Sequence, residues 1–133
     1  MQNIINFFNT ENYEYISNNF SILFNHNNNE IHLYFEGFTK DDYFDLEKLK
    51  SLIDNLDIIV NKAREIIKEN SNEYIKKDMV DFFGFNDIII YKDDTFNIGF
   101  DIGDPPIGEL YYIYIKFDWN FNASKDIIYE CYK

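Results

Sequence analysis

Residues 101–118 gather the groups that could do chemistry in this chain: carboxylates, glycines, two adjacent prolines and several tyrosines. A phosphate-binding loop needs glycine-exposed backbone amides that run into the N-terminus of a helix. Here Gly103 and Gly108 flank Pro105 and Pro106, whose nitrogens cannot donate hydrogen bonds, and a strand-like pattern follows. The stretch therefore predicts a rigid turn between strands and argues against a phosphate site.

The sequence also lacks the residue spacing of known metal-binding sites. A calcium loop needs carboxylates at alternating positions, a central glycine and a terminal glutamate, and the acids of residues 93–109 do not follow that spacing. Zinc sites favour cysteine and histidine ligands, yet His26 and His32 have no cysteine near them in sequence. A loop histidine and an ordinary strand histidine are the simpler interpretations. We expect no metal and no cofactor.

The sequence shows no pattern typical of catalysis. Nucleophilic catalysis needs a nucleophile, a base and an orienting group, and Cys131 has no histidine near it in sequence. A small buried residue is its simpler interpretation. Paired carboxylates could do acid–base work, but among 24 acids such a pair carries almost no specificity. We expect a protein that is not an enzyme.

Charge is the first functional clue. The chain has 24 acidic and 12 basic residues, a net charge of −12, and the excess of acids extends along its whole length. Such a surface repels nucleic acid and anionic membranes and attracts basic proteins. A simpler interpretation is that acidity keeps an aromatic-rich protein soluble. We expect no nucleic acid and no membrane as partner.

The first two thirds of the chain change from a strand pattern to a helix pattern. Apolar residues alternate in 20–24 and 31–35, which predicts a β-hairpin. After Gly37, apolar residues recur at steps of three and four, which predicts a helix over about 40–69, or one that breaks near Asp54-Asn55. Residues 70–84 then predict a second helix, which Gly84 ends.

The last third returns to strands. Four apolar runs, at 87–91, 96–102, 109–118 and 126–132, are separated by polar turns and predict an antiparallel meander. Helices confined between two blocks of strands indicate the α+β class. We expect a single domain over residues 1–133, with one antiparallel sheet in the order β-β-α-α-β-β-β-β and two helices packed on one face.

The N-terminus has neither a basic segment nor a long apolar segment of the kind that opens a secretory signal, and no apolar run approaches the length of a membrane span. We therefore expect a cytoplasmic protein. Lysine greatly outnumbers arginine, and asparagine and isoleucine are abundant, which indicates an AT-rich coding genome and a bacterial source.

Several stretches together resemble a known type of protein. They are the hairpin "FSILFNHNNNEIHLYFEG", the helix "LEKLKSLIDNLDIIVNKAREII", "SNEYIKKDM", and the closing strands with "KFD" and an acid, Glu130, near the end. The chain resembles small bacterial α+β proteins found among the immunity proteins of polymorphic toxin systems, including contact-dependent growth inhibition. It departs from them at "WNFNAS", where a shorter turn with glycine is expected. The resemblance implies a non-catalytic inhibitor that binds a cognate toxin and covers its active site.

The sheet face that the helices leave uncovered is the expected contact surface. Alternation places acids and tyrosines there, and tyrosine is enriched where proteins bind one another. Cross-strand packing of tyrosines on a solvated sheet is the competing interpretation. A third is that the N-terminal segment folds over this face. The predicted contact residues are Asp101, Asp104, Glu109, Tyr112, Tyr114 and Tyr132, with Asp93, Asp94 and Trp119 at the rim.

A basic, nuclease-type toxin would complement this surface, because nucleases bind phosphates through positive charge. The inhibitor itself is expected to be a monomer or a weak dimer. Two alternatives stay open. One is a small acidic adaptor or self-associating domain that uses the same tyrosines. The other is a small-ligand binder or enzyme, which would require a deep pocket with converging polar groups.

Overall fold

The structure is a computed structural model that describes the backbone of residues 2–3, 13–16, 19–39, 41–71, 75–102 and 110–131, and the side chains of residues 21–39, 41–71, 75–102 and 112–130. The strands are β1 (Gln2–Asn3), β2 (Tyr13–Ile16), β3 (Asn19–His26), β4 (Asn29–Glu36), β5 (Tyr43–Phe44), β6 (Gly84–Ile90), β7 (Thr95–Asp101), β8 (Leu110–Asp118) and β9 (Ala123–Cys131). The helices are α2 (Leu46–Asp54), α3 (Leu56–Glu69) and the 3-10 helix η1 (Lys77–Phe82).

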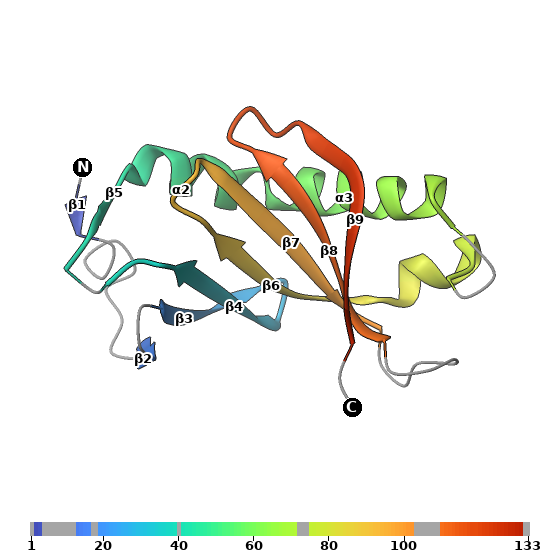
Figure 1. Cartoon of the computed structure of the whole chain (residues 1–133), viewed down its shortest axis with the longest axis horizontal. Coiled ribbons are helices and arrows are strands. Elements are labelled where there is room, and N and C mark those ends of the chain that lie inside the picture. Colours follow the sequence, from blue (N-terminus) through green and yellow to red (C-terminus); the bar gives the residue numbers. More distant parts are fainter. Residues whose placement is uncertain are drawn as a thin grey trace.

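One mixed sheet dominates the fold and confirms the α+β class (Figure 1). Its seven strands lie in the order β2-β3-β4-β6-β7-β8-β9, and β1 pairs with β5 separately. The expectation of a purely antiparallel sheet needs one correction, because β4 and β6 are parallel. The chain between them contains α2, α3 and η1, and a crossover of this length is what returns a chain to start a parallel neighbour.

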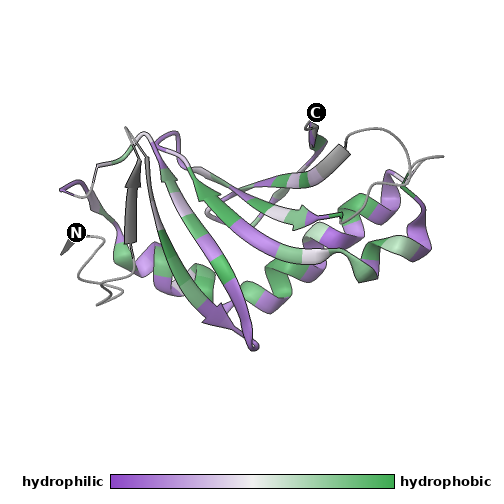
Figure 2. Ribbon diagram, turned by 90° about the horizontal axis from the view of Figure 1, so that it is seen from below, coloured by the Kyte–Doolittle hydropathy of each residue, from purple (hydrophilic) through white to green (hydrophobic). Residues whose placement is uncertain are grey.

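The long helical stripe forms two helices instead of one. Asp45 begins α2 by accepting a hydrogen bond from the backbone amide of Glu47 at 3.1 Å. At Asn55 the helix is interrupted, and the Asn55 side chain donates to the carbonyl oxygen of Ser51 at 2.8 Å. The break expected near Asp54-Asn55 is therefore present. The two helices on one face of the sheet are α2 and α3 (Figure 2).

The prediction of a second helix over residues 70–84 is largely wrong. Asn70 ends α3, and the only helical segment that the structure describes between α3 and β6 is the six-residue η1. In this helix, backbone amides donate to carbonyl oxygens three residues earlier. The amide of Met79 donates to the carbonyl of Lys76 at 2.9 Å, and the amide of Phe83 donates to that of Val80 at 3.1 Å. Val80 is fully buried whereas Phe82 is 88% exposed, so η1 contributes only a narrow apolar contact to the core.

The core lies between the helices and one face of the sheet, as the alternation predicts. The fully buried apolar residues of β7 and β8 are Phe96, Ile98, Phe100, Ile113, Ile115 and Phe117, and those of the helices include Leu49, Leu52, Leu56 and Ala63. The same alternation appears as stripes of hydropathy along the strands in Figure 2. Burying one such large apolar side chain stabilises a fold by about 1.5–3 kcal/mol, so this layer supplies most of the stability.

Arg64 connects the helical layer to η1. Its Nη1 donates to the carbonyl oxygens of Val80 and Phe83, each at 2.8 Å, and its guanidinium lies 4.8 Å from the centre of the Phe100 ring. Burial lowers the pKa of Arg64 from its usual value. The only arginine in the sequence thus anchors the segment between α3 and β6 to helix α3 through these hydrogen bonds.

Candidate functional site

The sheet face opposite the described helices, here called the outer face, carries tyrosines and most of the polar side chains of the central strands. Register places them side by side across four strands: Asp87 pairs with Gly99, Gly99 with Tyr114, and Tyr114 with Ile128. On the parallel side, His32 pairs with Asp87. The sequence neighbours of Gly99 and Tyr114 are buried in the core, and so is Ile88 after Asp87, so alternation assigns these residues to the outer face.

A hollow of about 280 Å³, here called the acidic trough, lies in the middle of the outer face. It is lined by Tyr34, Glu36, Asn86, Asp87, Ile89, Tyr112, Tyr114 and Glu130. Asp87 and Tyr114 are each only 6% exposed and form its floor, whereas Glu36 and Glu130 are exposed and form its rim. None of the described lining residues is basic.

Asp87 is the unusual group in this trough. Its Oδ2 accepts a long hydrogen bond from the Tyr114 hydroxyl at 3.4 Å, and within the described residues its Oδ1 has no hydrogen-bond partner. Burial raises the pKa of Asp87 from 3.8 to about 6, and the nearby charges of Glu130 and Asp101 add to that rise. A carboxylate that is buried and unpaired costs free energy in the ionised state.

Gly99 makes the burial of this carboxylate possible. A Cβ atom at this position would overlap Asp87 Oδ1 and would come within 2.5 Å of the Tyr114 ring. Glycine inside a strand commonly marks such a close approach. The Tyr114 ring therefore packs over Gly99, which is the cross-strand packing that the simpler interpretation of the tyrosines expects.

Tyr91 and Tyr112 stay protonated at neutral pH. Burial, together with the charges of Glu36 and Glu130, raises the pKa of Tyr91 to about 12. Burial also raises the pKa of Tyr112, with Asp101 adding to it. Next to the trough, Asn97 donates to the Tyr91 hydroxyl at 3.0 Å. The outer face thus offers carboxylate acceptors beside neutral phenol rings.

The structure brings together part of the predicted contact surface. Asp101 and Tyr112 are paired neighbours on the outer face, Tyr112 and Tyr114 line the trough, and their rings lie 6.4 Å apart. Asp104, Glu109 and Tyr132 lie outside the residues whose side chains are described.

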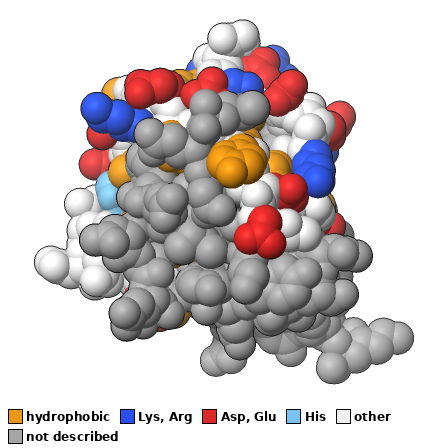
Figure 3. Space-filling view, turned by 90° about the vertical axis from the view of Figure 1, so that its left-hand side faces the viewer, with side chains coloured by type: hydrophobic (Ala, Val, Ile, Leu, Met, Phe, Trp, Pro, Cys, Tyr) orange, Lys and Arg blue, Asp and Glu red, His pale blue; other side chains and the backbone are white. Residues whose placement is uncertain are grey.

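The predicted rim residues lie elsewhere. Asp93 and Asp94 occupy the turn at the opposite end of β7 from Asp101, where Asp94 pairs with Lys48 at 3.5 Å. At this end of the molecule, acidic side chains alternate with basic ones (Figure 3). The Trp119 ring lies 4.7 Å from that of Phe96 on the core side of the sheet. Trp119 is therefore part of the core boundary and is not continuous with the trough.

Sequence reasoning missed the centre of the site. The sequence pattern places Asp87 only at the start of a strand, and the predicted contact surface does not include Tyr34, Glu36 or Glu130. A signal was available, because Gly99 interrupts an otherwise alternating strand. Only the pairing of Asp87 with Gly99 shows what that glycine accommodates.

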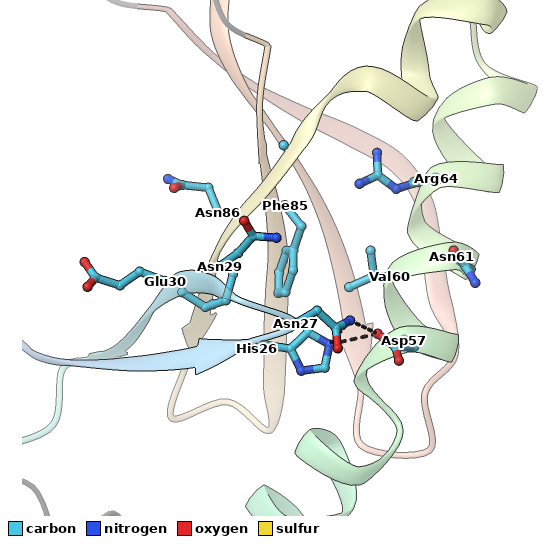
Figure 4. Close-up of a pocket in the computed structure, with 12 residues that line it drawn as sticks. His26, Asn27, Asn29, Glu30, Asp57, Val60, Asn61, Arg64, Phe85 and Asn86 are labelled. Atoms are coloured by element: carbon cyan, nitrogen blue, oxygen red, sulfur yellow. Dashed lines mark hydrogen bonds and ion pairs between the residues drawn. The ribbon is translucent and has the colours of Figure 1, made fainter.

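A larger hollow, of about 680 Å³, lies between the β3–β4 hairpin, α3 and the start of β6 (Figure 4). Its polar groups hold the hairpin to the helix: His26 Nε2 lies 2.8 Å from Asp57 Oδ1, and Asn27 donates to the same oxygen at 3.1 Å. The hydrogen bond from His26 lowers the pKa of Asp57. Arg64 also lines this hollow, but two backbone carbonyls already occupy its Nη1. These groups explain how the hairpin is attached, and they do not converge on a single point.

Two further observations bear on what the site can do. The described residues contain no group of three or more His, Cys, Asp or Glu side chains arranged to hold a metal ion. No helix in the described part of the chain has both the length and the apolarity that crossing a membrane requires.

Comparison with protein-family models, with curated proteins and with solved structures finds no match to this chain. The resemblance to immunity proteins therefore stays a prediction.

Proposed function

We propose that this chain is a non-catalytic immunity protein, an inhibitor that binds and neutralises a cognate bacterial toxin with a basic, nuclease-type surface. The observation that supports this proposal best is the acidic trough, in which a buried carboxylate, exposed carboxylates and neutral tyrosines meet on one face of the sheet. The contact surface is then centred on Asp87, Tyr112 and Glu130, with Asp101 beside them.

The physical logic is charge complementarity. A nuclease binds phosphates in a basic cleft, and a face with several carboxylates presents a similar charge to that cleft. The net charge of −12 would speed the encounter, at a rate that falls as salt is added. Tyrosines supply stiff, amphipathic contact area once the two surfaces meet.

Co-expression with the protein encoded by the gene directly upstream tests this proposal. We expect the two proteins to co-purify at low salt and cells that carry both to survive. A variant with Glu36→Gln and Glu130→Gln should lower the affinity about tenfold or more, because it removes two exposed charges from the rim of the trough. The variant with Asp54→Asn and Glu69→Gln removes two exposed charges from the helices and should bind as the wild type does.

Two outcomes would contradict the proposal. The proteins could elute separately at low salt, or the two double variants could lose affinity equally. The second result would mean that overall charge acts without a defined contact face.

One observation favours a second candidate, a self-associating domain. Strand β9 lies at the end of the strand order, and Ile128 and Tyr129 on it are 38% and 41% exposed. Edge strands with apolar side chains can pair with another copy. Sedimentation velocity would reveal such a dimer, and Ile128→Lys should dissociate it; a monomer at all concentrations would remove this candidate.

A further inference from the structure

We propose that the acidic trough is a receptor for one arginine side chain, presented by the basic partner protein. This inference rests on the proposed function and names the group that the outer face recognises. The structure places an unpaired, buried carboxylate oxygen at the floor of a hollow whose described rim carries further carboxylates and no base.

Asp87 is a buried carboxylate with one unsatisfied oxygen. The side chain is 94% buried, since its exposed fraction is 6%, and the part of the chain that the structure describes offers no hydrogen-bond donor to its Oδ1. Native proteins rarely leave such an acceptor unsatisfied, and a bound water or ion commonly completes one that the protein does not. Oδ1 lies between Gly99 and the Tyr114 ring, so a cation that enters the trough and displaces this ring would supply both the missing donor and the missing charge.

The lining decides what kind of cation fits. A divalent metal ion needs several ligands around one point, and the described residues form no such group. Tyr34, Tyr112 and Tyr114 instead surround the hollow with phenol rings, the surroundings in which a flat guanidinium stacks well. A guanidinium can also donate two parallel hydrogen bonds to one carboxylate, which an ammonium group cannot do.

The negative charge at the rim of the trough also favours a cationic ligand. Glu36 and Glu130 are exposed and lie where the rest of a basic segment would pass. Their charges, with that of Asp101, favour a cation over any neutral or anionic group. A volume of about 280 Å³ accommodates one side chain and excludes a folded element.

Titration of the isolated, isotopically labelled chain with n-propylguanidinium chloride tests the inference, with n-propylammonium chloride as the comparison and NaCl to hold the ionic strength constant. We expect saturable changes in the amide resonances of Asp87, Gly99 and Tyr114, and about tenfold weaker binding of the ammonium compound. Asp87→Asn should weaken guanidinium binding at least tenfold. Asp54→Asn, a change of equal charge on α2, should leave it unaltered.

Glu130→Gln provides a second variant in case Asp87→Asn alters the fold. It keeps the floor of the trough intact and should weaken binding severalfold. Resonance changes spread evenly over the acidic surface would overturn the inference, as would equal binding by the Asp87→Asn variant. Because this measurement uses no toxin, its failure is distinct from failure of the proposed function, which co-purification tests separately.

Discussion

Replacing Asp87 by asparagine should stabilise the protein at neutral pH. In the folded chain, burial raises the pKa of Asp87 from 3.8 to about 6. A pKa difference of one corresponds to about 1.36 kcal/mol. Ionised Asp87 therefore destabilises the fold by about 3 kcal/mol relative to its protonated form, and Asp87→Asn should recover up to that amount at pH 7.5.

The dependence on pH has a definite sign. Because the folded state holds this proton more tightly than the unfolded state does, the contribution of Asp87 to the free energy of unfolding rises as the pH falls from about 7 toward 4. The contribution is complete below the unfolded pKa of 3.8 and is lost as the pH rises through the folded pKa of about 6. The titratable or charged groups that face Asp87 or lie near it are His32, Tyr34, Glu36, Tyr91, Asp101, Tyr112, Tyr114 and Glu130.

Urea denaturation of the wild type and of Asp87→Asn, at intervals between pH 4.5 and pH 8, measures this effect. The difference between the two proteins cancels the other carboxylates, provided that they titrate alike in both. We expect the two curves to separate by about 2–3 kcal/mol above pH 7 and to converge toward pH 4.5. Parallel curves, or a carboxyl resonance of Asp87 that titrates near pH 4, would refute the account of a desolvated carboxylate.

Substitutions at three further positions test the packing and the hairpin turn. Gly99→Ala should lower the free energy of unfolding by about 1–3 kcal/mol, because its Cβ would displace Asp87 and the Tyr114 ring, and thermal denaturation measures this. Arg64→Met should cost about 2–3 kcal/mol in urea denaturation, since two backbone carbonyls lose a charged donor; an unchanged midpoint would contradict that role. Asn28→Gly should stabilise the protein by up to about 1 kcal/mol, because Asn28 has a φ of 67° in the hairpin turn, and Asn28→Val should destabilise it.

Local patterns predicted the elements where short-range physics decides them. The alternation in 96–102 and the stripe from Leu46 to Ile67 appear in the structure as β7 and as the buried sides of α2 and α3. The segment from 70 to 84 was misread because its apolar residues occur at helical spacing, yet it forms the short η1. Arg64 binds the carbonyls of Val80 and Phe83, a long-range contact that no local pattern contains.

For the candidate site too, local patterns predict some features and only long-range contacts explain the others. The sequence by itself determined the acidic charge, the α+β class, and which residues of each strand share a face, because side-chain alternation is a local property of the backbone. Only the tertiary structure decided that β4 and β6 are parallel neighbours and that Asp87 lies beside Gly99 under Tyr114. Strand order and register bring together residues that are far apart in the chain, and burial by those neighbours is what changes the chemistry of a carboxylate.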